Sequence, residues 1–300
     1  MRFRTHVAGL PLRLDREARR LWKDLAMSIA ALLCVVVALV PLGSILIEAT
    51  ARGLQAIRPS FFSLDTADGG IGNAIQGTLI LVALASLISL PVGILTGVYL
   101  SEFGKNRLGG SIRFFVDVMT QVPSIVVGIF AYSIILELGQ AGIVSTRLVF
   151  SAISGTLALS VIMIPFVART AEEAMRLVST STREAGLALG IPRYRVILRI
   201  VLPSSASALV TGALLGVARV AGETAPLLMT AFGSGFGFSG LDHPVESLPH
   251  TIYTFALSPY TAQNQAAWGA SLVLVVIMLL ISVFSRLLLR SRYPIGGVGR

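Results

Sequence analysis

Two opposite charges, Arg219 and Glu223, interrupt an otherwise apolar stretch in the second half of the chain. A spacing of four residues places both side chains on one face of a helix, where they can pair. An arginine at the centre of a membrane helix costs roughly 2.5–3.5 kcal/mol, so it is expected to face a polar interior. A guanidinium also offers parallel donors to an oxyanion. The pair therefore predicts either a structural ion bridge or, together with Thr224, a site on an anion path.

A second candidate charge lies in an earlier apolar stretch. Asp117 is a candidate buried charge, and Arg113 four residues before it makes a local ion pair the simpler interpretation. No metal site is expected, because the single cysteine, Cys34, and the three histidines are scattered along the chain.

A polar, basic segment at 184–203 separates two apolar stretches. Good helix formers lead up to Gly190, and Pro192 follows, which predicts the end of a short helix. Arg193 then begins a basic, amphipathic helix that runs to Pro203. The residues alone predict a helix, a sharp turn and a second helix outside the membrane. They fit a mechanical contact with a partner protein and a surface loop lying on lipid headgroups equally well.

The elements that position these residues are expected to be membrane helices. The chain is 54% hydrophobic and 13% charged, whereas soluble domains carry about 25% charged residues. Its uncharged stretches are each long enough for a span, and lipid offers backbone amides no partner outside a helix. Six helices are predicted, at 25–47, 73–100, 114–136, 148–168, 204–232 and 267–289. Prolines within these stretches, including Pro123 and Pro226, invite kinks.

The basic residues indicate how the chain is oriented in the membrane. Most of the 24 Lys and Arg residues fall in the segments that one side of a six-span arrangement would share. By the positive-inside rule, both termini and the 169–203 loop are expected in the cytoplasm. The formal charge of +9 then reflects orientation and contact with a lipid bilayer, so no nucleic-acid partner is expected. The first apolar run is too long for a signal-peptide core and predicts a retained helix.

The 184–203 segment resembles the cytoplasmic signature loop of permease subunits from ATP-binding-cassette (ABC) importers, written E-A-A-x3-G-x9-I-x-L-P. The spacing matches throughout. The residue types match except at Gly186, which replaces the second Ala of the pattern. The residues that carry this resemblance are Glu184, Ala185, Gly186, Gly190, Ile200, Leu202 and Pro203. The run from Arg219 to Leu228 and the run from Gln121 to Gly128 resemble phosphate importer permeases of the PstA type. This resemblance implies that Gln121, Pro123 and Ser124 are further candidates for the substrate path. The resemblance covers about residues 72–290.

This resemblance implies an all-α type I ABC importer permease fold with six transmembrane helices. It divides the chain into a basic lead (1–24), a first helix with an outside loop (25–71), the importer domain (72–290) and a basic tail (291–300). It implies a multi-pass protein of the bacterial inner membrane that forms half of a phosphate path.

The resemblance also implies the partners of such a permease. They are a PstC-type permease, two PstB-type ATPase subunits and a PstS-type phosphate-binding protein. ATP and Mg²⁺ belong to the ATPase, because this chain has no G-x4-G-K-[ST] phosphate loop. No cofactor and no catalytic chemistry are expected on the chain itself.

Three alternatives stay open. The first is an importer of another oxyanion or small solute. The second is an ion-coupled secondary transporter, which leaves the 184–203 pattern unexplained and often shows an internal repeat that this chain lacks. The third is a membrane-bound enzyme, which no nucleophile–base pair or cofactor motif in the sequence supports.

Overall fold

The computed structural model describes the backbone of residues 11–292 and the side chains of residues 20–283. Parts of the basic lead, including Arg2, Arg4 and His6, lie outside the described residues, as does the tail from 293 onward. The residues before Arg52 form one unit and those from Arg52 onward another, and each is described by itself.

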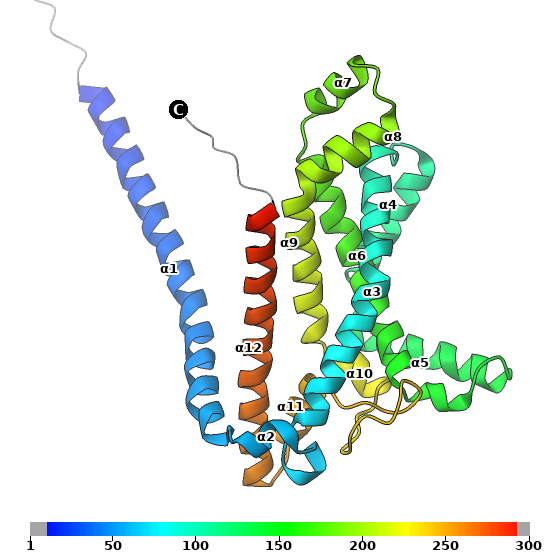
Figure 1. Ribbon diagram of the computed structural model, residues 1–300. Helices are drawn as coiled ribbons and strands as arrows, with labels where there is room; N and C mark the ends of the chain where they lie inside the picture. The colour runs from blue at the N-terminus through cyan, green and yellow to red at the C-terminus, as the bar shows by residue number, and fades with distance from the viewer. Residues whose placement is uncertain (1–10, 293–300) are drawn as a thin grey trace, which may run out of the picture. The chain divides into compact units, whose positions relative to one another are not determined.

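Every regular element within residues 11–292 is a helix (Figure 1). Five of these helices are long and apolar enough to cross a membrane, or six if one bent pair counts as a single span. The elements are α1 (Pro11–Ala56), α2 (Pro59–Ser63), η1 (Thr66–Asp68), α3 (Gly72–Glu102), α4 (Arg107–Met119), α5 (Ser124–Gln140), η2 (Thr146–Val149), α6 (Ala152–Arg176), α7 (Thr180–Ala188), α8 (Arg193–Val196), η3 (Ile197–Val201), α9 (Leu202–Ala221), α10 (Ala225–Met229), α11 (Leu248–Ala256) and α12 (Thr261–Arg292).

The first helix is longer at both ends than its apolar stretch predicts. Helix α1 begins at Pro11 and ends at Ala56, so it takes in much of the basic lead and part of the expected outside loop. Proline suits the first helical position, and the lead after it is rich in Arg and Leu, which favour helix. Pro41 lies inside α1 without ending it.

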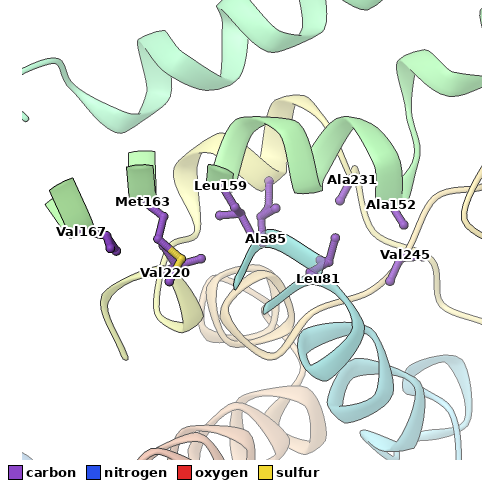
Figure 2. Close-up of a cluster of buried hydrophobic side chains, with 10 residues drawn as sticks. Leu81, Ala85, Ala152, Leu159, Met163, Val167, Val220, Ala231 and Val245 are labelled. Atoms are coloured by element: carbon purple, nitrogen blue, oxygen red, sulfur yellow. The ribbon is translucent and has the colours of Figure 1, made fainter. Parts of the chain in front are cut away.

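Helix α6 is the centre of the second unit, with α3 packed on one side and α9 on another. An added Cβ at Gly97 of α3 would lie 2.5 Å from the Cβ of Ala171, and one at Gly212 of α9 would lie 2.8 Å from Oγ1 of Thr170. Small residues allow such close approach of membrane helices. Figure 2 shows the cluster of buried side chains that α3, α6 and α9 share, including Leu81, Leu159, Met163 and Val220.

The prediction of one helix at 114–136 is wrong, because the third apolar stretch forms two helices. Helices α4 and α5 meet at a bend of 107°. Pro123 has extended geometry (ψ 132°) and lacks the N–H that a continuing helix would need. The residue before a proline also disfavours helical geometry, so the helix ends ahead of Pro123.

The prediction of a continuous fifth helix at 204–232 is also wrong. Helix α9 ends at Ala221, and the five-residue helix α10 begins only at Ala225. Gly222 occupies the C-cap of α9, and Pro226 stands in the first turn of α10, where a missing N–H is harmless.

The sharp turn between α7 and α8 lies at the end of the second unit opposite α5, α10 and α11 (Figure 1). At that opposite end, Asn73 secures the glycine-rich segment 233–240. Its Nδ2 donates to the carbonyl of Ser234 at 2.8 Å, and the amide of Ala67 donates to the carbonyl of Gly235 at 2.9 Å. The segment is therefore tied to the start of α3.

Candidate functional site

The predicted turn at Gly190 is present and has a defined hydrogen-bond pattern. Gly190 has a φ of +73°, in the left-handed region. Its amide donates to the carbonyl of Leu187 at 2.9 Å, and the amide of Ile191 donates to the carbonyl of Gly186 at 3.3 Å. These two bonds form a Schellman motif, which closes a helix C-terminus. A Cβ at Gly190 would meet no atom within 4 Å, so the backbone conformation alone favours glycine here.

Gly186 is buried where α7 packs on the following helix. A Cβ there would lie 3.0 Å from Cγ2 of Val196 and 3.1 Å from Cδ1 of Ile200. Both distances are tighter than normal carbon contacts, which are about 3.5–4.0 Å. The chain has glycine where the signature loop usually has alanine, and the close side chains of Val196 and Ile200 explain that departure.

The opposite face of α7 points away from the rest of the chain. Glu184, Ala185, Leu187 and Leu189 are all exposed. Within the described part of the chain, Glu184 makes no hydrogen bond or ion pair. A buried glycine on one side and an unpaired carboxylate among exposed apolar side chains on the other leave a face suited to contact with another protein.

Pro203 is accommodated by a π-helical turn, η3. The amide of Leu202 donates to the carbonyl of Ile197, five residues back. Pro203 has no N–H, and its ring would clash with the carbonyl four residues before it in a regular helix. The wider turn avoids both problems, so α8, η3 and α9 form one helical span, Arg193–Ala221. Ile200 and Leu202 are half-buried in the apolar cluster beneath α7.

Arg219 and Glu223 lie where the fifth span breaks. Arg219 occupies the last turn of α9, and Glu223 follows the C-cap residue Gly222. The Nε of Arg219 is 3.8 Å from Oε1 of Glu223, which is an ion-pair contact but too long for a hydrogen bond. The guanidinium also lies 5.7 Å from the ring centre of Phe166 on α6.

The guanidinium of Arg219 keeps its donors available. Its side chain is 46% exposed, whereas that of Glu223 is 16% exposed. Considering only residues 20–283, the guanidinium donates no hydrogen bond to the protein. Such a group, held by an ion-pair contact and an aromatic ring, can still offer planar donors to an oxyanion.

Asp117 pairs with a residue distant in sequence, so the expected local pair with Arg113 is wrong. Its carboxylate accepts a hydrogen bond from Nη1 of Arg169 on α6. Arg169 also donates to Glu173 at 3.1 Å. Arg113 instead donates to Glu172 at 2.7 Å, because helix α4 packs along α6 and offers each charge a closer partner there.

This second charged group lies close to the first along α6. Arg169 follows Phe166 by three residues, a rise of about 4.5 Å along a helix. Arg219 stacks over Phe166. The structure thus brings the third and fifth apolar stretches to neighbouring levels of α6.

The other candidates occupy the two breaks. Nε2 of Gln121 turns back to the carbonyl of Asp117 at 3.0 Å. Pro123 caps α5 and Ser124 begins it. The carbonyl of Thr224 accepts the amides of Leu227 and Leu228 at 3.1 and 3.2 Å, so its main chain starts α10.

Two buried carboxylates near the turn between α7 and α8 were missed by the sequence analysis. Glu102 pairs with Arg183 at 2.8 Å, and Glu172 pairs with Arg113 at 2.7 Å and with Arg176 at 2.5 Å. Each carboxylate follows an apolar run, which is the only sequence signal that could have identified it. Among the side chains that the structure describes, no three or more His, Cys, Asp or Glu gather as a metal ion would require.

A family model described as "Binding-protein-dependent transport system inner membrane component" matches residues 89–291. The chain is 40% identical over 250 residues to the phosphate transport system permease protein PstA of Xylella fastidiosa (strain 9a5c), covering 81% of this chain and 85% of that protein. It is 37% identical over 254 residues to PstA of Yersinia pestis, covering 83% of each.

Two solved structures of ABC transporters have a similar fold. An inward-facing form of the MetNI methionine ABC transporter matches with a TM-score of 0.58 and 20% identity, over 78% of this chain and 99% of that one. A bacterial ABC transporter involved in the import of the acidic polysaccharide alginate matches with a TM-score of 0.61 and 16% identity, over 91% and 98%. At these identities the likeness concerns the fold.

Proposed function

The chain belongs to the family of binding-protein-dependent transport system inner membrane components, and from that premise we propose that it is the permease subunit of an ATP-driven importer of inorganic phosphate. It is a multi-pass membrane protein with an ABC importer permease fold and no catalytic role of its own. Relatives that are 35–41% identical and named PstA support phosphate as the solute.

The observation that carries the proposal is that the guanidinium of Arg219 is exposed and donates no hydrogen bond within residues 20–283. Its guanidinium lies at a break in a membrane span, is 46% exposed and is held by a 3.8 Å contact with Glu223. An arginine with a purely structural role would be expected to donate hydrogen bonds to carbonyls or carboxylates of the protein. The N–H donors of Arg219 instead remain available to bind phosphate as it crosses the membrane. The nearby negative charge of Glu223 limits how tightly the anion is held. Thr224, Gln121, Pro123 and Ser124 contribute to the same path.

Energy enters through the face of α7 that carries Glu184 and Ala185. We assign this face to a groove on an ATPase subunit, which binds ATP and Mg²⁺. Gly186 and Gly190 set its shape, and Ile200, Leu202 and Pro203 connect it to the fifth span. The complete importer comprises a PstC-type permease, two PstB-type ATPases and a PstS-type phosphate-binding protein. The importer domain occupies residues 72–290, in a bacterial inner membrane with both termini in the cytoplasm.

The test is uptake by the reconstituted complex. The two permeases and the two ATPase subunits are reconstituted in proteoliposomes with ATP inside, and entry of ³²P-phosphate is followed with the loaded binding protein outside. ATP-dependent entry that unlabelled phosphate suppresses and sulfate does not is the expected result. Suppression by sulfate alone would favour another oxyanion as the solute. Entry driven by an ion gradient without ATP would instead identify a secondary transporter.

A further inference from the structure

Glu102, the last residue of α3, is buried against the helix that carries the signature residues. Its side chain is only 6% exposed. Arg183 on α7 donates to Oε1 of Glu102 twice, from Nε at 3.0 Å and from Nη2 at 2.8 Å. Hydrogen bonds between two charged groups are stronger and more directional than neutral ones. The end of α3 therefore holds α7 in one position.

The same arginine also secures the end of α6. Its Nη2 donates to the carbonyl of Met175 at 2.8 Å, and its Nη1 donates to the carbonyl of Val178. These carbonyls belong to the last turn of α6 and the link beyond it, where a helix leaves acceptors unpaired. A cation at a helix C-terminus is also favoured by the helix dipole. Arg183 thus connects α7 to two membrane helices at once.

A second arginine, on the other side of the Gly190 turn, contacts the same end of α3. Nη2 of Arg193 donates to the main-chain carbonyl of Glu102. Its guanidinium lies 4.6 Å from the ring centre of Phe103. Arg183 precedes the turn and Arg193 follows it, so the end of α3 contacts residues on both sides of the turn.

Beside these contacts, α7 exposes a face that can meet another protein. Glu184, next to Arg183, is exposed, and so is Leu189. A push on that face reaches the membrane through two connections. One is the apolar contact of Gly186 with Val196 and Ile200, which leads into α9. The other is the Glu102–Arg183 pair, which leads into α3.

Stability alone is a poor reason for a buried ion pair. Replacing such a pair by well-packed apolar residues is often neutral or stabilising, whereas the pair fixes a definite geometry. Both Oε1 contacts and both carbonyl contacts of Arg183 depend on orientation, because its guanidinium is a planar fork. The arrangement suits a fixed joint between moving parts.

We propose that Glu102 is a positioning residue for coupling, which locks the α7–α8 turn to α3 so that movement of the turn is transmitted to the α3–α6 core. This inference rests on the proposed function, since it presumes an ATPase that pushes on α7. It adds a second mechanical route beside α9. Without the lock, α7 moves against the ATPase while α3 stays in place, and ATP is hydrolysed with little transport.

The experiment compares two buried carboxylates in the reconstituted complex. Glu102→Gln removes the charge that holds α7. Glu172→Gln is the matched control, because Glu172 is 9% exposed and also pairs with arginines, on α4 and α6 but not on α7. Phosphate entry, ATP hydrolysis stimulated by the phosphate-loaded binding protein, co-purification of the ATPase and thermal stability are measured for each.

Glu102→Gln is expected to lower the ratio of phosphate transported to ATP hydrolysed about tenfold, the scale of one lost charged hydrogen bond, while the ATPase still co-purifies. Glu172→Gln is expected to lower thermal stability and leave that ratio within about twofold of wild type. Glu102→Asp keeps the charge but withdraws it by one methylene, so an intermediate ratio is expected.

An unchanged ratio in Glu102→Gln overturns the proposal, and so does an equal fall in Glu172→Gln. If both Glu102 variants fail to assemble while Glu172→Gln assembles, the role of Glu102 lies in folding and the proposal is also wrong. Failure of the wild-type complex to carry phosphate is a different outcome, which rejects the proposed solute. The ratio is then measured with the solute that the wild type does transport, and the inference on Glu102 is judged there.

Discussion

Gly128 on α5 lies directly against the main chain of Pro226 on α10. A Cβ added at Gly128 would be 2.7 Å from the Cα of Pro226 and 2.9 Å from its carbonyl oxygen. This contact joins α5 and α10, the helices that follow the two breaks. The break before α5 and the break before α10 are therefore parts of one arrangement.

Gly128→Val is expected to destabilise this junction, because overpacking against a main chain costs about 1–3 kcal/mol. Phosphate uptake is expected to fall with it. Gly110→Val is the control, since Gly110 lies within α4 and an added Cβ there meets no atom within 4 Å. Thermal unfolding and uptake of both variants check this, and equal stability of the two variants would contradict the contact.

Arg219→Gln is expected to abolish phosphate uptake while the complex assembles and binds ATP. If the pair were only structural, Arg219→Gln would leave the half-buried carboxylate of Glu223 without its partner, and the stability and assembly of the complex would fall. The double variant Arg219→Gln with Glu223→Gln separates the two cases. Uptake at the wild-type rate in the double variant would reject Arg219 as a phosphate ligand.

Arg219→Lys keeps the positive charge and loses the planar fork. An intermediate uptake rate is expected if the charge guides phosphate, and a rate near that of Arg219→Gln is expected if two parallel donors are needed. The initial rate of ³²P entry at saturating phosphate distinguishes them. A wild-type rate would mean that neither property of the guanidinium limits transport.

Gly190→Asn is expected to preserve the fold and weaken the attachment of the ATPase. Asparagine tolerates the left-handed region better than most residues, so strain at φ +73° stays small. Its side chain would nevertheless project from the turn. Gly142→Asn is a matched control, because Gly142 has a φ of +71° and equally open surroundings, but lies after α5. Co-purification of the ATPase is measured, and undiminished recovery with Gly190→Asn would contradict contact at the turn.

The proposed orientation is tested with single cysteines in a Cys34→Ala background. Ser60→Cys, Ser145→Cys and Ser239→Cys should react with an impermeant thiol reagent added outside intact cells, and Ser181→Cys should not. All four serines are exposed, so access depends on the side of the membrane. Labelling of Ser181→Cys from outside would reverse the assignment of the α7 turn to the cytoplasm.

The sequence predicted most of the helices and the turn at Gly190, because both depend on local properties. An apolar stretch of sufficient length is helical in lipid whatever its neighbours are. The Gly190–Pro192 pattern ends a helix through its own backbone. Both features were recovered close to their predicted places.

The broken spans and the charge partners depend on tertiary contacts and were mispredicted. Pro41 and Pro226 look alike as prolines in apolar stretches, yet α1 continues through Pro41 while the fifth span is interrupted ahead of Pro226. Gly222 ends α9 ahead of Pro226, and the main chain of Pro226 packs against Gly128, a combination that sequence periodicity does not reveal. Asp117 likewise pairs with Arg169 and not with Arg113, because α4 lies along α6.

The single helical span from Arg193 to Ala221 begins next to the Gly190 turn and carries Arg219 near its other end. Its 29 residues extend about 43 Å at the usual helical rise. If it pivots near the π turn, a tilt of about 5° displaces the far end by about 3 Å, comparable to the length of a hydrogen bond. Movement of the proposed ATPase contact and release of an anion from Arg219 would then occur at the same time.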